Sequence, residues 1–320
     1  MIKRLIIKLS PLIDILSIPV TFFSAIVLKC VRMVGLDNLP VSKKILFKVG
    51  VFPIRNHYYE PLFRTDLLSK PLTEDRVLPG LDINLEGQLA LLSEFNYTDE
   101  LKDIGFKKVP PPEFYFSNDS FEPGDGEYWY NIVRHFKPKK IIEIGSGNST
   151  LMAMRAVKKN CAEDSAYKCD HICVEPYEHL WLEKLGITVK RERVEDIDKA
   201  FFTELKENDI LFIDSSHIIR PQGDVLTEYL EILPILSKGV IVHVHDIFTP
   251  KDYLESWVKG EVKLWNEQYL LEAFLTNNDS WQVIGALNYL TKNYFEKMSE
   301  KCFHLKSFHE PGSFYIQKIK

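Results

Sequence analysis

The sequence has 320 residues, of which 45% are hydrophobic and 27% are charged, and it carries a formal net charge of −5 at pH 7. This length fits one large α/β domain with an added segment, or two small domains. The composition predicts a globular protein, and the acidic balance without any long basic run excludes an electrostatic case for a nucleic-acid partner. No sequence pattern indicates the oligomeric state.

The first predicted element is an apolar stretch at residues 9–28, which contains the single charge of Asp14 and is predicted to be broken by Pro11 and Pro19. A spanning helix needs about 20 mostly apolar residues, so the length is borderline. Basic residues precede and follow the stretch, so charge sets no orientation. Three interpretations stay open, in this order of preference: a pair of core-packing helices, an interfacial helix, or a membrane anchor. A peripheral membrane contact would use residues 9–34.

The cysteine pattern indicates reduced thiols. The five cysteines are irregularly spaced, which argues against a disulfide framework and favours a reducing, cytoplasmic compartment. Cys169 and Cys173 flank His171, but this is not the C-x-x-C spacing of zinc sites, so we do not predict structural zinc.

Three consecutive prolines at residues 110–112 mark the first predicted boundary. Such a run cannot continue a helix or join a central strand, so we interpret it as a stiff linker. It divides the chain into an N-terminal region, residues 1–112, and a main domain, residues 113–320.

After this linker, strand and helix patterns alternate. The predicted strands are residues 140–144, 171–175, 188–194, 209–214 and 239–246, followed by late strands at 281–287 and 313–319. The predicted helices are residues 124–137, 149–159, 177–185, 196–205, 225–236 and 266–275. Strict alternation implies βαβ crossovers and a parallel sheet covered on both faces. Ligands bind such α/β sheets beyond the carboxyl ends of the strands.

The strand at residues 140–144 runs into a glycine turn, Gly145-Ser146-Gly147, and then into a helix. Glycines there let the backbone approach a ligand, and the helix start offers free N–H groups. A dinucleotide fingerprint requires a third glycine, and Thr150 occupies that position. The helix start also includes Ser149, a plausible cap.

Acidic residues at the ends of three successive strands point to the cofactor. Glu143 precedes the glycine turn, where an anion would repel a pyrophosphate but suit the sulfonium and amino groups of S-adenosylmethionine. Glu175, followed by Pro176, ends the second strand, where an acid can bind both ribose hydroxyls. Glu195 and Asp196 follow the third strand and could meet the adenine amino group. Together these acids predict an adenosyl cofactor.

This succession resembles the class I S-adenosylmethionine-dependent methyltransferase superfamily, over residues 121–320. The resemblance implies an α/β, Rossmann-like, seven-stranded and mostly parallel sheet of order 3-2-1-4-5-7-6. The last strand would be antiparallel, and the N-terminal helical region would be an addition to this fold.

The fourth and fifth predicted strands end in Asp214 with His217 and in His245 with Asp246. These strands are neighbours in the inferred sheet, so the four side chains should converge. Histidine has a suitable pKa to take a hydroxyl proton near neutrality. Carboxylates with histidine can also hold a divalent cation, which would orient substrate oxygens, and the candidate metal ligands are Asp214, His245 and Asp246.

Residues 212–217 and 241–247 are similar to small-molecule and sugar O-methyltransferases, including metal-dependent macrolide-sugar enzymes. This resemblance implies that Asp214 is a ligand of Mg²⁺ or another divalent cation, that His217 is the base, and that Asp246 is the strand-five acid. Ile247 stands where the family often has a second acid or amide, so the case for a cation is weaker than the case for the base.

Residues 219–225, 248–253 and 265–271 look like a bacterial subgroup often associated with surface-polysaccharide synthesis. The implied acceptor is a small molecule or glycan. The candidate substrate residues, each with a structural role as the alternative, are His57, Tyr58, Arg220, Trp265 and Tyr269.

Two other functions compete with O-methylation. A non-catalytic adaptor with a methyltransferase fold would not need the acids and histidine described above. An NAD-dependent nucleotide-sugar enzyme usually needs a Tyr-x-x-x-Lys pair, and no tyrosine in this chain has lysine four residues on.

Overall fold

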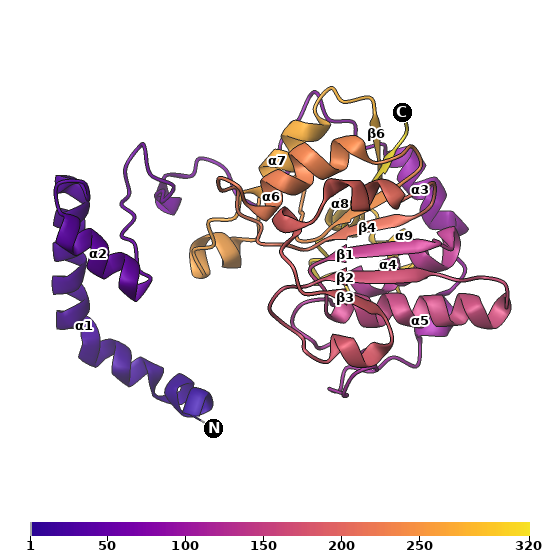
Figure 1. The fold of residues 1–320 in the computed structure, drawn as a ribbon, viewed down its shortest axis with the longest axis horizontal. Helices are drawn as coiled ribbons and strands as arrows, with labels where there is room; N and C mark the ends of the chain where they lie inside the picture. Colours follow the sequence, from indigo (N-terminus) through magenta and orange to yellow (C-terminus); the bar gives the residue numbers. More distant parts are fainter. Residues whose placement is uncertain (1) are drawn as a thin grey trace. The chain divides into compact units, whose positions relative to one another are not determined.

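The computed structural model describes residues 2–320, which form two compact units, Met1–Ser69 and Lys70–Lys320 (Figure 1). The division differs from the predicted boundary at residue 112. Leu92, Phe95 and Leu101 precede the three prolines, yet all three are buried in the core of the second unit. The proline run is therefore a segment within this unit, because the chain before it already contributes to the core.

The N-terminal unit contains two α-helices, α1 (Ile2–Val34) and α2 (Pro40–Val49), and the short 3₁₀ helix Thr65–Leu67. Pro11 and Pro19 both lie inside α1 without ending it. The preferred prediction, a pair of core-packing helices, is wrong in this respect. The apolar stretch is one continuous helix, and its segment Leu9–Val34 buries no side chain within the structure.

The second unit is built on a seven-stranded sheet of order β3-β2-β1-β4-β5-β7-β6. Strand β7 is antiparallel to both of its neighbours, and the described pairs among β1 to β5 are parallel. The strands are β1 (Lys140–Ile144), β2 (Asp170–Val174), β3 (Thr188–Lys190), β4 (Ile210–Ile213), β5 (Ile241–Val244), β6 (Trp281–Ala286) and β7 (Phe314–Lys318). The predicted fold class and strand order are confirmed.

The α-helices of this unit are α3 (Leu85–Glu94), α4 (Asp125–Phe136), α5 (Asn148–Glu163), α6 (Asp224–Thr227), α7 (Glu267–Leu275), α8 (Leu287–Asn293) and α9 (Phe295–Lys301). Helix α6 continues into the π-helix Glu228–Ile232, and together they cover most of the helix predicted at 225–236. The helices predicted at 177–185 and 196–205 are instead the 3₁₀ segments Leu182–Leu185 and Lys199–Glu204.

Side-chain alternation divides the core between the two faces of the sheet. Ile141 and Phe212 pack on the face covered by α3, α4, α5, α8 and α9. Ile142 and Leu211 pack on the opposite face, beneath α6 and α7. Because helices cover both faces, the loops at the carboxyl ends of the strands are the part of the sheet left open to a ligand.

Candidate functional site

A cavity of about 580 Å³ opens beside the loops that follow β1, β2 and β4. Most of the residues predicted to hold a cofactor line it. They are Gly145, Ser146, Gly147, Ser149, Glu175, Pro176, Glu195 and Asp214. Two other predicted residues, Glu143 and Asp196, are not part of this wall.

The glycine turn is shaped by its contact with the end of β4. Gly145 has φ of +76°, and a Cβ added to it would lie 1.9 Å from the carbonyl oxygen of Asp214. Only glycine accommodates both the left-handed backbone and this close approach. Beside it, the buried hydroxyl oxygen of Ser146 has no hydrogen-bond partner among the described residues. Buried polar atoms are usually hydrogen-bonded, so this hydroxyl on the cavity wall is suited to a ligand that supplies a hydrogen-bond partner.

The carboxylate of Glu175 is fixed at the end of β2. Its Oε1 accepts hydrogen bonds from the backbone N–H groups of Tyr177 and Glu178, both at 2.9 Å. Its Oε2 accepts only a long bond of 3.4 Å from the backbone of Ser146. The second oxygen therefore keeps acceptor capacity at the cavity wall, as a ribose-binding acid needs.

Glu143 is fully buried beneath the turn instead of facing the cavity. Its Oε2 accepts hydrogen bonds from the hydroxyls of Ser149 (2.9 Å) and Thr150 (2.8 Å), and its Oε1 lies 2.5 Å from Nε2 of His171. Burial alone would lower the pKa of His171, but Glu143 outweighs it and the pKa rises to about 10. The structure thus gives Glu143 a structural role, and its predicted contact with the sulfonium is not supported.

Asp196 forms an ion pair with Arg193 and does not line the cavity. Both of its carboxylate oxygens accept hydrogen bonds from the exposed guanidinium of Arg193, at 2.8 and 2.9 Å. Its neighbour Glu195 is the acid that reaches the cavity after β3.

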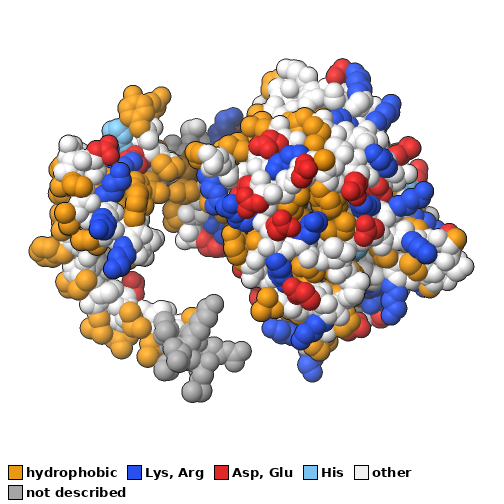
Figure 2. Space-filling model, in the orientation of Figure 1, with side chains coloured by type: hydrophobic (Ala, Val, Ile, Leu, Met, Phe, Trp, Pro, Cys, Tyr) orange, Lys and Arg blue, Asp and Glu red, His pale blue; other side chains and the backbone are white. Residues whose placement is uncertain are grey.

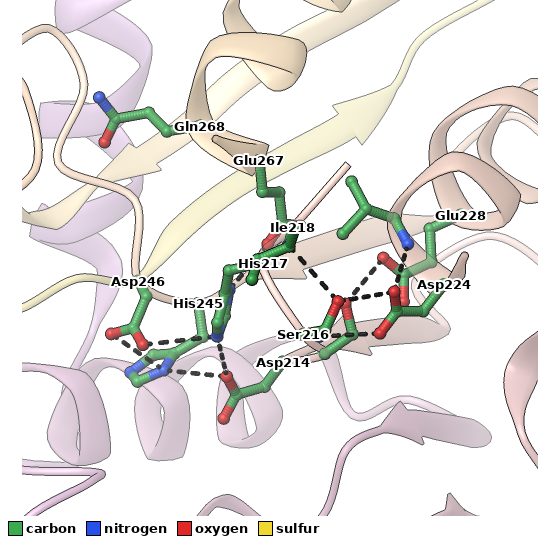
Figure 3. A network of polar contacts seen from close by, with 12 residues as sticks. Asp214, Ser216, His217, Ile218, Asp224, Glu228, His245, Asp246, Glu267 and Gln268 are labelled. Carbon is green, nitrogen blue, oxygen red and sulfur yellow. Dashed lines mark hydrogen bonds and ion pairs between the residues drawn. The ribbon is translucent and has the colours of Figure 1, made fainter. Parts of the chain in front are cut away.

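The predicted reaction centre comes together at the ends of β4 and β5 (Figure 3). Nε2 of His217 lies 3.3 Å from Oδ1 of Asp214 and 3.6 Å from Oδ2 of Asp246. One ligand atom from each of these three residues falls within 4.8 Å of the others, a spacing compatible with one cation.

Backbone geometry makes this convergence possible. Strand β5 ends at Val244, and both His217 and Asp246 adopt left-handed backbone with φ near +60°. Alternation along an unbroken strand would have placed His245 and Asp246 on opposite faces. The strand ends first, so both side chains reach the same site. Non-glycine residues with positive φ are uncommon and gather at functional sites.

Glu267, at the start of α7, is a site residue that the sequence analysis missed. Its Oε2 lies 2.8 Å from Nδ1 of His217, and its Oε1 accepts a hydrogen bond from the hydroxyl of Tyr229 at 3.1 Å. Burial lowers the pKa of His217, but Asp214 and Glu267 outweigh it and hold the pKa well above its usual value. With Nδ1 bound to Glu267, Nε2 is the nitrogen directed at Asp214 and Asp246.

His245 lies at the edge of this group. Its Nδ1 is 3.6 Å from Oδ1 of Asp214 and 3.5 Å from Oδ1 of Asp246, and neither ring nitrogen has a hydrogen-bond partner in the described structure. The three-residue group with cation spacing contains His217 in place of the His245 that the sequence predicted as a ligand.

The predicted substrate residues are dispersed. Arg220 lines the first cavity, with Nη2 3.5 Å from Asp224. The ring of Trp265 packs on His217 with centroids 4.2 Å apart, and the hydroxyl of Tyr269 bonds Asp252 at 3.0 Å. Trp265 therefore supports His217, whereas Tyr269 bonds a residue outside the reaction centre, and neither of them lines either cavity.

His57 and Tyr58 lie in a loop of the N-terminal unit, where both side chains are exposed. Their role toward a substrate stays a prediction.

A second cavity, of about 420 Å³, adjoins the reaction centre and shares His245 and Asp246 with it. Phe248 and Trp257 contribute an aromatic wall, with ring centroids 5.3 Å apart. Asp214 lines the first cavity and Asp246 lines the second, and both carboxylates lie close to Nε2 of His217. This arrangement suits two reactants that meet at one histidine.

The amino-acid sequence is similar to a known family model and to an uncharacterized protein. A family model described as a methyltransferase domain matches residues 142–247, which run from β1 to just beyond β5. An uncharacterized protein of Archaeoglobus fulgidus is 31% identical over 175 residues, covering 49% of this chain and 75% of that protein.

Two solved structures show similarity at low sequence identity. An SAH-bound methyltransferase of Podospora anserina has 16% identity and a TM-score of 0.38, covering 75% of this chain and 88% of that chain. An O-methyltransferase from Bacillus cereus in complex with SAH has 13% identity and a TM-score of 0.36, covering 80% of this chain and 94% of that chain.

Proposed function

We propose that this chain, which belongs to the class I S-adenosylmethionine-dependent methyltransferase superfamily, methylates a hydroxyl oxygen of a small-molecule or glycan acceptor. The enzyme class, S-adenosylmethionine-dependent methyl transfer, follows from the family. The choice of oxygen as the methylated atom rests on one observation. His217 is oriented by Glu267 and directs Nε2 to Asp214, which lines the first cavity, and to Asp246, which lines the second.

The first cavity is the proposed cofactor site. S-adenosylmethionine supplies an electrophilic methyl group when it is bound. Glu175 would accept hydrogen bonds from the ribose hydroxyls, Glu195 would meet the adenine edge, and Asp214 would face the positive end of the cofactor. The open hydroxyl of Ser146 and the close approach at Gly145 support this assignment.

His217 is the proposed general base. It acts in its neutral form, and because the pKa of this imidazole is raised, the share of that form increases only towards higher pH. Nε2 would take the hydroxyl proton of the acceptor as its oxygen receives the methyl group that the cofactor would supply, and the cofactor would leave as the neutral thioether. General base catalysis of this kind contributes about 10²- to 10⁴-fold to a rate. The His217→Ala variant should abolish methyl transfer but retain cofactor affinity measured by calorimetry. Loss of cofactor binding in this variant would instead make His217 structural.

A divalent cation such as Mg²⁺ is a further part of the proposal. The carboxylates of Asp214 and Asp246 are the hard oxygen ligands that such a cation prefers. Nε2 of His217 cannot donate its one lone pair to a cation and take a proton at the same time, so the two acids would bind the ion and the histidine would stay the base. Turnover that survives exhaustive chelation would remove the cation and leave the base in place.

The acceptor site would be the second cavity, because its wall includes Asp246, whose carboxylate lies 3.6 Å from Nε2 of His217, and none of the residues predicted to hold the cofactor. A sugar hydroxyl is the proposed methylation site, as the resemblance to polysaccharide-associated enzymes implies. A screen of saccharides for release of S-adenosylhomocysteine by the full chain tests this choice. Turnover restricted to acceptors without a sugar would contradict it.

Helix α1 is the proposed membrane contact of an otherwise cytoplasmic enzyme. Its segment Leu9–Val34 is long and apolar enough to cross a membrane, judged by length and composition. Figure 2 shows hydrophobic side chains along the surface of the N-terminal unit, with lysine and arginine among them. Such a surface is costly in water unless a membrane or partner covers it.

A further inference from the structure

The wall of the second cavity is rich in acidic residues. It contains five carboxylates, those of Asp119, Glu122, Asp125, Asp246 and Glu310. Among the described residues that line it, none is a lysine or an arginine. Sites that bind phosphates or carboxylates usually supply lysine or arginine, so this wall is unsuited to an anionic acceptor.

The protein itself satisfies only part of this negative charge. Glu310 is paired with Lys292 at 2.6 Å, and Asp125 accepts hydrogen bonds from the backbone of Gly312 and Ser313. The carboxylates of the other two outer residues, Asp119 and Glu122, have no hydrogen-bond or ion-pair partner within the described part of the chain.

The crowding of these acids affects the pKa of one of them. Partial burial raises the pKa of Glu122, and the nearby charges of Asp119 and Asp125 raise it further. A positive charge placed beside them would relieve this repulsion, whereas a negative charge would add to it.

His245 supplies a second and independent sign of a ligand. Its side chain is only 4% exposed and lines the cavity. Its ring nitrogens lie 3.5 to 3.9 Å from carboxylate oxygens of Asp246, Asp214 and Asp125, but neither nitrogen makes a hydrogen bond among the described residues. Buried polar groups are nearly always hydrogen-bonded, so a ligand oxygen or nitrogen is expected to complete this imidazole. The ligand then has a polar group at the inner end of the cavity, next to Asp246.

The two ends of the cavity are therefore suited to different chemical groups of one ligand. The inner end, at His245 and Asp246, suits hydroxyls close to the reacting oxygen. The outer end, at Asp119 and Glu122, suits a cation. Trp257 adds an aromatic ring to the wall, and Lys263 of the protein lies over that ring with Nζ 3.9 Å from its centroid.

We infer that the acceptor is a polyhydroxylated amine, such as an amino sugar, whose ammonium group binds beside Asp119 and Glu122 while a hydroxyl reaches His217. This inference rests on the proposed function, because it assigns the second cavity to the acceptor. It predicts that the enzyme selects a cationic acceptor over a neutral or an anionic one of the same size.

Three probes with one carbon skeleton test the inference: D-glucamine, D-sorbitol and D-gluconate, which end in an amine, a hydroxyl and a carboxylate. Each is titrated by calorimetry into the full chain saturated with S-adenosylhomocysteine. We expect glucamine to bind at least about tenfold more tightly than sorbitol, which corresponds to about 1.4 kcal/mol, and gluconate to bind most weakly.

Two charge-removing variants make the test specific. Glu122→Gln should reduce the affinity for glucamine about threefold to tenfold and leave that for sorbitol unchanged. Glu86→Gln is the matched control, because Glu86 is exposed on α3 and lines neither cavity. Equal binding of the three probes, tighter binding of gluconate, no saturable binding of glucamine, or equal losses in both variants would overturn the inference.

The titration of S-adenosylhomocysteine itself separates the two proposals. If the nucleoside binds but the probes show no charge preference, the inference about the acceptor fails and the methyltransferase assignment remains. If the nucleoside does not bind, the proposed cofactor site fails first.

Discussion

Nδ1 of His217 lies 2.8 Å from Oε2 of Glu267, a residue 50 positions later in the chain. The carboxylate is fully buried, and the hydroxyl of Tyr229 bonds its other oxygen. A buried carboxylate beside a histidine fixes the ring orientation and the position of its proton. Glu267 is thus the residue that positions the proposed base, although it touches neither cavity.

Replacing this carboxylate should slow methyl transfer without removing the cofactor. We expect Glu267→Gln to lower kcat about 100-fold, because base catalysis is worth at least that much. Loss of the negative charge should also lower the pKa of His217 and move the acidic limb of the kcat–pH profile to lower pH. Tyr229→Phe, which leaves the charge in place, serves as the control and should keep the profile. An unshifted limb in Glu267→Gln would mean that the carboxylate only supports the fold.

The glycine turn offers a second test, with an internal control. Gly145 and Gly186 both have left-handed backbone, with φ of +76° and +74°. Alanine at either position costs about 1–2 kcal/mol of backbone strain. At Gly186 the added Cβ has nothing within 4 Å, whereas at Gly145 it would overlap the carbonyl oxygen of Asp214.

Gly145→Ala should therefore weaken S-adenosylhomocysteine binding at least about tenfold by calorimetry, while Gly186→Ala keeps wild-type affinity. Both variants should lose some thermal stability. Similar affinities for the two variants would show that the cofactor does not lie against this turn.

The buried pair of Glu143 and His171 predicts a pH dependence of stability. The pKa of His171 is about 10 in the folded protein, against about 6.5 for a free imidazole. Between these values the folded chain holds a proton that the unfolded chain has lost, so stability falls as the pH rises. The contribution is complete below about pH 6.5 and is lost by about pH 10.

Urea unfolding at intervals from pH 6.5 to 10 measures this slope. The double variant Glu143→Gln/His171→Gln keeps polar groups at both positions but cannot take up the proton, so its slope should be shallower than that of the wild type. Identical slopes in the two proteins would exclude the ion pair as the source.

The sequence predicts the strands and the glycine turn after β1 well, for physical reasons that particular residues show. The apolar run Lys140–Ile144 gives β1 its observed bounds, because it is short, rich in isoleucine and followed by glycine. The role of Glu143 could not be predicted in the same way. Its partner His171 comes from the neighbouring strand, and only the register that sets Glu143 beside Cys173 brings the two together.

Long-range contacts explain the other differences. No local pattern connects Glu267 to His217, because a helix start and a loop after β4 meet only in the folded chain. The prolines of α1 were interpreted as breaks, since proline in a helix interior usually disrupts it. A helix surrounded by lipid tolerates proline better, because leaving the helical state would expose more backbone to hydrocarbon. The uninterrupted α1 is thus one more reason to test the membrane proposal.

The N-terminal helix should hold the protein on membranes through its apolar surface. Leu16 and Phe23 lie within Leu9–Val34, and their side chains are 70% and 72% exposed. On insertion scales a central acidic or basic residue costs about 2.5–3.5 kcal/mol, so Leu16→Lys/Phe23→Lys should move the full chain from the membrane pellet to the supernatant. Val77→Lys, which charges an 86% exposed position of the second unit, should leave the distribution unchanged. Removal of residues 1–35 should release the protein as well. If the shortened chain still pelleted with membranes, the contact would have to lie elsewhere, because the exposed apolar helix would no longer be present.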